Sequence, residues 1–301
     1  MTALVLVALF APPPVGPVPA DPFDRADDIT VVAVVHPFTA AAWTAAGELL
    51  TVSPEKDEPG AAGLLRRYAA DLTLSATVKL PATARELVLD EAAGRLFAVT
   101  GTPTDDTPSA GLLVVYKFAD LTGESATPVA TLRSPLRVTG VARSADGKLL
   151  YAAVGTAVLT VDATTLRQTA SVKGAAERVT ATGRPLGRAE LGGPVLGYVA
   201  GVALVGDPPR LLRIPADGPA ADITPADGLS AASQLAAVGD RLVLIAATGS
   251  GIEVLTLTGD KAVPVAKRAG KPPHEFRGPV AVSADGGRAA CGCGTVAGLP
   301  K

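Results

Sequence analysis

A repeat is the sequence feature that most constrains how this chain folds. Each unit has an apolar segment, a polar turn containing glycine, and a second apolar segment, and successive units start at intervals of roughly 46 to 53 residues. The turn glycines that we assign are Gly47, Gly94, Gly147, Gly193, Gly239 and Gly286. The longest interval contains a polar, proline-rich insert at residues 102–110. An internal repeat of this length is typical of solenoids, propellers and other arrays.

Each unit continues with a third apolar segment, a second polar turn and a fourth short apolar segment. The third segments are residues 63–68, 111–118, 156–162, 210–214 and 251–257. Asp-Gly and Asp-Leu-Thr between runs of β-branched residues are typical of hairpin turns. Four antiparallel strands per unit is the content of one propeller blade. The pattern therefore predicts an all-β fold, a β-propeller.

One stretch resembles a known repeat family. Residues 144–172 begin Ser-Ala-Asp-Gly-Lys-Leu-Leu-Tyr and contain a Val-x-Val-x-Asp-like strand, and Ser283 to Gly286 repeat the Ser-Ala-Asp-Gly turn. This is similar to the WD40/YVTN-type β-propeller repeat superfamily, with Val161-Asp162 standing where a full repeat has Trp-Asp. Two of the six units match closely. The resemblance implies a propeller fold and permits either a binding module or, as in lactonase-like propellers, an enzyme.

The two ends of the repeat region complement each other. The last unit lacks a fourth strand, whereas residues 29–35 read as a strand without a partner in their own unit. Because unpaired sheet edges promote aggregation, we expect residues 29–35 to form the outer strand of the last blade. This predicts a single domain over residues 29–301 with six four-stranded blades. The alternative is a seven-bladed ring with one degenerate blade near residues 180–221.

The N-terminus predicts export. Residues 1–20 combine a short apolar run (residues 3–10), prolines and small residues at Val18 and Ala20, as in a signal peptide cleaved before Asp21. Residues 21–28 then form a linker. The predicted location is periplasmic or extracellular, and the alternative is cytoplasmic. The apolar run is too short to span a bilayer, and we expect no transmembrane segment.

Composition excludes several classes of protein. The net charge is −2, from 27 basic and 29 acidic residues, so no basic excess is available for nucleic acid. Aromatic residues make up 4% of the chain, too few for a base-stacking platform.

Cys291 and Cys293 would lie on one face of a strand, too far apart for a disulfide, and are predicted core residues. Trp43 is predicted to pack between blades.

The repeat also indicates a candidate ligand site. The innermost strands of a propeller all begin at one mouth of the central channel, so residues at equal offsets should form a ring there. Nine residues before the turn glycines stand Arg85, Arg184 and Arg277, with Arg137 one residue off register, and His36, His274 and Glu275 lie in the same loops. Converging guanidinium groups suit a carboxylate or phosphate. The alternative is structural, with Arg85 paired to Glu86 and Arg277 to Glu275 at strand entrances.

No catalytic motif is present, and the chain has only two histidines. We therefore predict a non-catalytic scaffold that binds another protein, with no cofactor and no metal. The alternative is a protein that binds an anionic small molecule, or a lactonase-like enzyme, using the arginine-lined channel mouth. The scarcity of histidine weakens acid–base chemistry near neutral pH.

Overall fold

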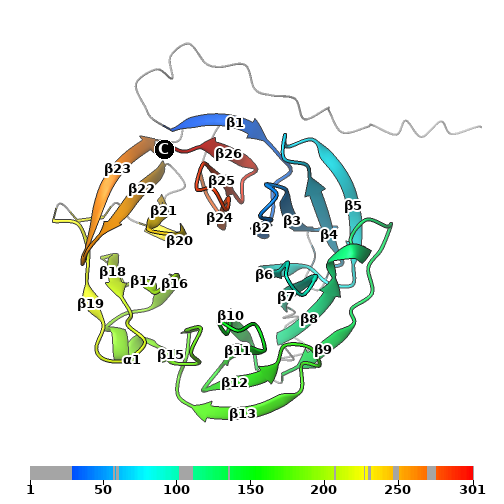
Figure 1. Cartoon of the computed structure of the whole chain (residues 1–301), viewed down its shortest axis with the longest axis horizontal. Helices are drawn as coiled ribbons and strands as arrows, with labels where there is room; N and C mark the ends of the chain where they lie inside the picture. The colour runs from blue at the N-terminus through cyan, green and yellow to red at the C-terminus, as the bar shows by residue number, and fades with distance from the viewer. Residues whose placement is uncertain are drawn as a thin grey trace, which may run out of the picture.

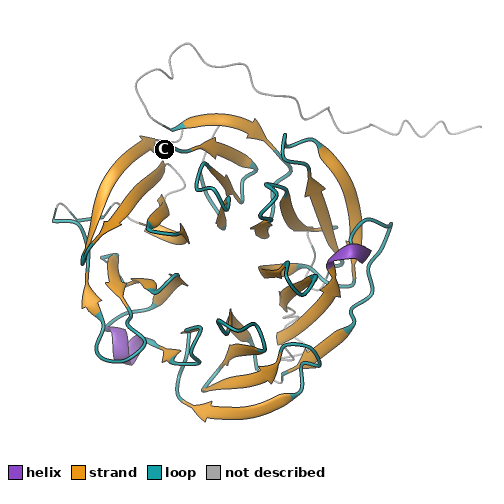
Figure 2. Ribbon diagram, viewed as in Figure 1, coloured by secondary structure: helices purple, strands orange, loops and turns teal. Residues whose placement is uncertain are grey.

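The blades form a closed ring. The computed structural model describes residues 29–56, 58, 61–101, 111–134, 136–206, 208–226, 228–229, 232–246, 251–269 and 276–300. These residues build six four-stranded antiparallel sheets around a central channel (Figure 1), almost without helix (Figure 2). The predicted six-bladed, all-β propeller is confirmed.

Each blade runs from an innermost to an outermost strand. Blade 1 consists of β2 (Ala40–Trp43), β3 (Leu49–Pro54), β4 (Gly63–Tyr68) and β5 (Leu74–Leu80). Blade 2 consists of β6 (Ala84–Asp90), β7 (Arg95–Gly101), β8 (Gly111–Lys117) and β9 (Ala130–Arg133). Blade 3 consists of β10 (Val138–Arg143), β11 (Leu149–Val154), β12 (Ala157–Asp162) and β13 (Gln168–Lys173). A 3-10 turn at Phe118–Asp120 follows β8.

The second half repeats the arrangement. Blade 4 consists of β16 (Val195–Val199), β17 (Val202–Val205), β18 (Arg210–Arg213) and β19 (Ala221–Asp222). Blade 5 consists of β20 (Ala232–Val238), β21 (Arg241–Ala246), β22 (Gly251–Thr258) and β23 (Lys261–Ala269). Blade 6 consists of β24 (Val280–Val282), β25 (Arg288–Cys291), β26 (Thr295–Gly298) and the N-terminal β1 (Thr30–Val34).

The Ser-Ala-Asp-Gly turns have the same geometry in blades 3 and 6. Ser144 Oγ donates to Asp146 Oδ1 at 2.7 Å, and Ser283 Oγ donates to Asp285 Oδ1 at 2.6 Å. The glycine that follows adopts a φ of 70° in one turn and 69° in the other, a left-handed conformation that favours glycine. The motif therefore specifies the hairpin between the two innermost strands.

The ring closes as predicted, by pairing of the two ends of the repeat region. β1 pairs antiparallel with β26, from Thr30 opposite Gly298 to Val34 opposite Thr295, and it lies on the outside of blade 6 (Figure 1). Just before β1, the Ile29 side chain is fully buried, and its carbonyl oxygen accepts a 2.6 Å hydrogen bond from Arg268 Nη1. The closure thus also joins blade 6 to blade 5.

The fourth unit differs from the sequence assignment. Gly193 is not its turn glycine: the innermost hairpin is β16–β17, turning at Ala200 and Gly201, which both have positive φ. A short hairpin, β14 (Arg178–Val179) with β15 (Pro185–Leu186), and α1 (Arg188–Leu191) precede it. This insertion lengthens the connection from blade 3, so equal spacing selects the wrong glycine. Residues 180–221 hold part of this insertion and most of blade 4, not a seventh blade.

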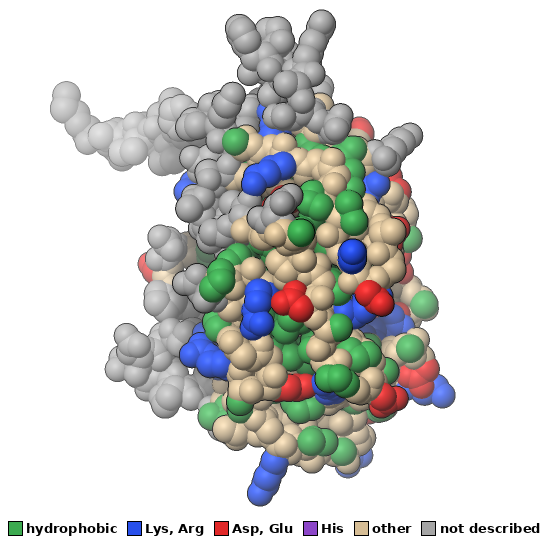
Figure 3. Space-filling view, turned by 90° about the vertical axis from the view of Figure 1, so that its left-hand side faces the viewer, with side chains coloured by type: hydrophobic (Ala, Val, Ile, Leu, Met, Phe, Trp, Pro, Cys, Tyr) green, Lys and Arg blue, Asp and Glu red, His purple; other side chains and the backbone are tan. Residues whose placement is uncertain are grey.

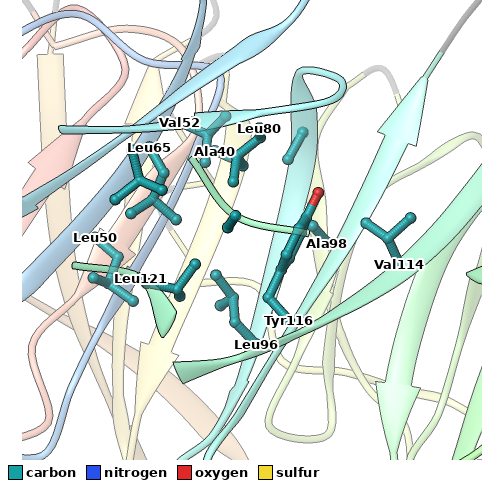
Figure 4. Packing of buried hydrophobic residues seen from close by; sticks show 13 residues of the cluster. Ala40, Leu50, Val52, Leu65, Leu80, Leu96, Ala98, Val114, Tyr116 and Leu121 are labelled. Atoms are coloured by element: carbon teal, nitrogen blue, oxygen red, sulfur yellow. The ribbon is translucent and has the colours of Figure 1, made fainter. Parts of the chain in front are cut away.

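The hydrophobic core lies between blades. Tyr116, Leu96 and Leu121 pack against buried residues of blade 1, as Figure 4 shows for the cluster between blades 1 and 2. Between blades 3 and 4 the inserted hairpin fills the seam, since Val179 packs with blade 3 and Leu186 with blade 4.

Three residues that the sequence assigned to packing lie as expected. Trp43 spans the seam between blades 1 and 6, where its Nε1 donates to the Ala281 carbonyl at 3.1 Å. Cys291 is buried in the core of blades 5 and 6, Cys293 is partly buried beside it, and the two thiols form no disulfide.

Three segments named in the sequence analysis fall on other parts of the chain. The predicted signal peptide (residues 1–20), the linker (residues 21–28) and the insert at residues 102–110 lie outside the described residues. In the part that is described, no helix has both the length and the apolar character needed to cross a bilayer.

Candidate functional site

Two neighbouring cavities open along the channel. The larger, of about 350 Å³, is lined by the innermost strands of all six blades. The smaller, of about 310 Å³, lies between blades 2 and 3 and the inserted hairpin, and we call it the side cavity. Its lining residues are Arg85, Glu86, Val99, Arg137, Val138, Thr139, Glu177, Arg178 and Val195. Arg85, Glu86 and Arg178 line both cavities, so the two are contiguous.

Arg178, the first residue of β14, is fixed between blades 3 and 4. Its Nη1 donates to the carbonyl oxygens of Thr139 and Glu177, and its Nη2 donates to Leu196 O at 3.4 Å. Gly140 on β10 leaves room for this side chain, because a Cβ there would lie 3.0 Å from Arg178 Cδ. All these acceptors are carbonyls, so the hydrogen bonds hold the guanidinium without neutralising its charge.

Arg85 and Arg137 stand at the starts of the innermost strands of blades 2 and 3. Among the described residues, neither guanidinium makes an ion pair within 4.0 Å, and Arg85 Nε is buried without a hydrogen-bond partner. Burial lowers the pKa of Arg85, and the nearby charge of Arg137 lowers it further. An arginine remains protonated despite such a shift, so the cavity wall carries two positive charges, and the nearby Glu86 partly compensates that of Arg85.

Two glutamates share the cavity wall. Glu86 Oε1 accepts a hydrogen bond from Val141 N at 3.4 Å. Burial raises the pKa of Glu86, and the charges of Arg178 and Arg85 partly oppose that shift. Glu177 Oε2 accepts from Val195 N at 2.5 Å, and its Oε1 lies 3.9 Å from Arg188 Nε. Glu177 therefore holds the entry to blade 4.

The structure brings together part of the predicted ring of residues. Arg85 and Arg137 line the side cavity. Arg184 instead lies between β14 and β15, where Nη2 contacts Glu190 Oε1 at 2.5 Å and Nη1 donates to Gly218 O at 2.8 Å. It stands elsewhere because the turn glycine of blade 4 is Gly201.

The remaining predicted residues lie away from the side cavity or outside the description. Arg277 lines neither cavity. His36 connects β1 to β2, where its backbone N–H donates to Tyr68 Oη at 3.1 Å and its Nδ1 lies 3.0 Å from the same oxygen. His274 and Glu275 lie outside the described residues.

Sequence reasoning missed Arg178 and the glutamates as members of the site. Arg178 has no equivalent in the repeat, because it belongs to the inserted hairpin. The available signal is the stretch from Glu177 to Gly187, with Val179 on one side and Pro185-Leu186 on the other side of a turn at Gly183. Glu86 is adjacent to Arg85 in sequence, which suggested an ion pair, but the structure gives it a backbone partner in blade 3.

The arrangement can hold an anion. Three arginines and two glutamates line a small cavity whose other lining residues are Val99, Val138, Thr139 and Val195. Within the described residues, no group of three or more His, Cys, Asp or Glu side chains is placed to bind a metal ion.

Comparison with solved structures identifies the fold. The C-terminal WD40 domain of Sif2 is similar with a TM-score of 0.56 and 10% identity, over 91% of this chain and 99% of that one. A structural genomics protein of unknown function from Bacteroides thetaiotaomicron gives 0.54 and 11%, over 94% of this chain and 74% of that one. The β-propeller domain of Swd1 from Myceliophteria thermophila gives 0.47 and 15%, over 87% and 83%. No protein-family model and no curated protein matches the sequence.

Proposed function

We propose that this chain, a β-propeller with the WD40-type fold, is a non-catalytic scaffold that binds another protein. The observation that carries this proposal is the outermost strand of blade 3. All six residues of β13 are exposed, and Val172 is 51% exposed. A long exposed edge strand with an apolar side chain is a template for pairing with a second chain.

The outer edge of β13 in blade 3 differs from the outer edge of β5 in blade 1, which is covered by another segment of the chain. Outside β5, Lys79 N donates to Glu124 O at 2.9 Å and Ala126 N donates to Lys79 O at 3.0 Å, so a loop of blade 2 covers that edge. β13 pairs only with β12 among the described strands. Its outer edge is therefore available to an extended segment of a partner.

The register of β13 shows which amides face outward. Gly174 N donates to Thr156 O at 2.8 Å, and Val172 lies opposite Val158. Because amides alternate in direction along an antiparallel strand, those of Ser171 and Lys173 point away from β12. A partner strand would bond to these groups, as in β-strand addition.

Other outer strands also expose apolar side chains. Leu74 on β5, Val129 before β9, and Val263 and Val265 on β23 are between 40% and 49% exposed. Figure 3 shows the side of the ring that carries β19 and β23, where small groups of hydrophobic side chains lie between Lys or Arg and Asp or Glu. A rigid perimeter with mixed chemistry suits partner binding, and β13 is its most exposed strand.

The test uses a matched pair of variants at one residue. Ser171→Pro removes an outward N–H without breaking a bond to β12, whereas Ser171→Ala keeps the N–H. We expect a partner captured by the native chain to be retained by Ser171→Ala and lost by Ser171→Pro. Equal capture by both variants would exclude the β13 edge. Failure of the folded native chain to capture any protein from its own organism would overturn the scaffold proposal.

We further propose that residues 1–20 direct export. The support is the sequence pattern alone, and N-terminal sequencing of the mature chain tests it. A start at Asp21 is the expected result, and a retained N-terminus at residue 1 or 2 would contradict it.

A further inference from the structure

We propose that the side cavity binds a small organic monocarboxylate, with its carboxylate held by Arg85 and Arg137 and its apolar part against valines. The site is separate from β13 and does not depend on the scaffold function.

Unused donors are the first support. Arg85 Nε is buried without a partner, and Arg85 and Arg137 make no ion pair with any residue that the structure describes. A buried donor without an acceptor is destabilising, so such groups are normally satisfied by protein, water or ligand. A carboxylate offers two acceptor oxygens in the planar arrangement that a guanidinium fork matches.

The site is also preorganised. Arg178 is held by carbonyl oxygens from β10 and β16, so its charge stays at the wall of the cavity before any ligand binds. Arg85 and Arg137 lie on neighbouring blades, each at the start of an innermost strand, so they approach the cavity from two sides. A donor that is already held in place loses little conformational freedom on binding, and among these arginines Arg178 is the one held by hydrogen bonds to the described residues.

The charge balance favours one negative charge. Arg85, Arg137 and Arg178 carry three positive charges, and Glu86 and Glu177 carry two negative charges when both are ionised. The lining residues thus have one positive charge in excess, which a monocarboxylate neutralises. A phosphate dianion would exceed that balance and would be repelled by both glutamates.

Shape and lining favour an organic ligand. A cavity of about 310 Å³ is at the small end of ligand sites. Val99 on β7, Val138 on β10 and Val195 on β16 supply apolar walls from three blades. A short apolar body would bury surface against these side chains, whereas acetate would not reach them.

Glu86 gives the site a pH dependence. The charged groups that act on its carboxylate are Arg178 and Arg85, and Arg137 and Glu177 line the same cavity. Because burial raises the pKa of Glu86, it is protonated at a higher pH than an exposed glutamate. Protonation removes one negative charge from the wall, so anion affinity should increase as the pH falls toward that pKa.

Benzoate is the probe for the test, and benzamide is its uncharged counterpart. Isothermal titration of the full chain should show saturable binding of benzoate and none of benzamide at equal concentration. Acetate and inorganic phosphate should each bind at least tenfold more weakly than benzoate. Benzoate affinity should rise when the pH is lowered from about 7 to 5, and this rise should disappear in Glu86→Gln.

Variants locate the site. Arg85→Gln and Arg137→Gln should each weaken benzoate binding at least tenfold, whereas Arg184→Gln, outside the side cavity, should leave it unchanged. Arg85→Lys keeps the charge but lacks Nε, and it should bind more weakly than the native chain.

Folding of the variants is checked by near-UV circular dichroism. Absence of benzoate binding to the folded native chain would overturn the proposal. So would equal benzoate affinity in Arg85→Gln, Arg137→Gln and Arg184→Gln, or tighter binding of phosphate than of benzoate. None of these results bears on capture of a protein at β13.

Discussion

Ile29 should be essential to the closure of the ring. Its side chain is fully buried among residues of blades 5 and 6, including Phe276, Ile245 and Ala297. Ile29→Ala removes three buried carbons while leaving the backbone carbonyl that accepts the hydrogen bond from Arg268. The change therefore tests the packing of the closure and leaves its hydrogen bond intact.

The expected loss of stability follows from burial. Truncation of a buried isoleucine to alanine costs about 2–5 kcal/mol, comprising the lost transfer free energy and the cavity left behind. For a domain of this size, each kcal/mol lowers Tm by roughly 2–4 °C. We therefore expect Tm to fall by roughly 4–20 °C. Val34→Ala on the same strand is the control, because that side chain is 38% exposed and should cost less than about 1 kcal/mol.

Urea unfolding followed by circular dichroism and scanning calorimetry measures both variants. An unchanged m-value with a lower midpoint would show that Ile29→Ala altered stability and not the extent of unfolding. A free energy of unfolding within about 0.5 kcal/mol of the Val34→Ala value would refute the packing role of Ile29.

Three further outcomes can be measured. Burial raises the pKa of the Cys291 thiol, so iodoacetamide at about pH 8 should modify this thiol only in unfolded protein. Peptide mass spectrometry measures the modification, and rapid labelling of folded protein would contradict the burial of Cys291. Burial lowers the pKa of His36, so the unfolded chain binds more protons than the folded chain just below pH 6.5. The free energy of unfolding should therefore fall as the pH decreases from about 7 to 5. This fall should be smaller in His36→Gln, and an equal fall in that variant would contradict the lowered pKa of His36. The Arg288 guanidinium lies 4.7 Å from the ring centroid of Trp43, so Arg288→Gln should shift the emission of the only tryptophan and cost about 1 kcal/mol; an unchanged spectrum would argue against the contact.

Local patterns predicted most of the fold because each blade is built from short-range hairpins. The Ser-Ala-Asp-Gly turns, for example, are specified by hydrogen bonds within a few residues of Asp146 and Asp285. The closure by residues 29–35 was also predictable. The last unit lacked its fourth strand, and the strand at residues 29–35 had no partner in its own unit. Pairing the two ends of the repeat region supplies the missing strand and the missing partner.

Blade 4 was placed less well because its inner turn has no polar signal. The turn at Ala200 and Gly201 lies within a run of apolar residues, whereas Gly193 fits the repeat interval. The inserted hairpin displaces the true turn from that interval. The residue at the repeat's sequence offset in blade 4 is therefore not equivalent to its counterparts in the other blades.

The same displacement explains how much of the candidate site could be predicted. Arg85 and Arg137 precede the insertion, and both line the side cavity. Arg184 lies within the insertion, between β14 and β15, and bonds to Glu190 instead. Arg178 belongs to the insertion itself, and only the folded ring shows that it lies beside Arg85.

The pairing of β1 with β26 has a consequence for the order of folding. Thr30 lies opposite Gly298, so almost the whole sequence separates the two strands that complete blade 6. Contacts between distant parts of a chain form late because a large loop must close first. A circular permutant that joins Pro300 to Ile29 through a short linker, which keeps the buried Ile29, and opens the chain between blades 6 and 1 would convert this contact into an ordinary hairpin. It should refold faster while keeping the same six blades.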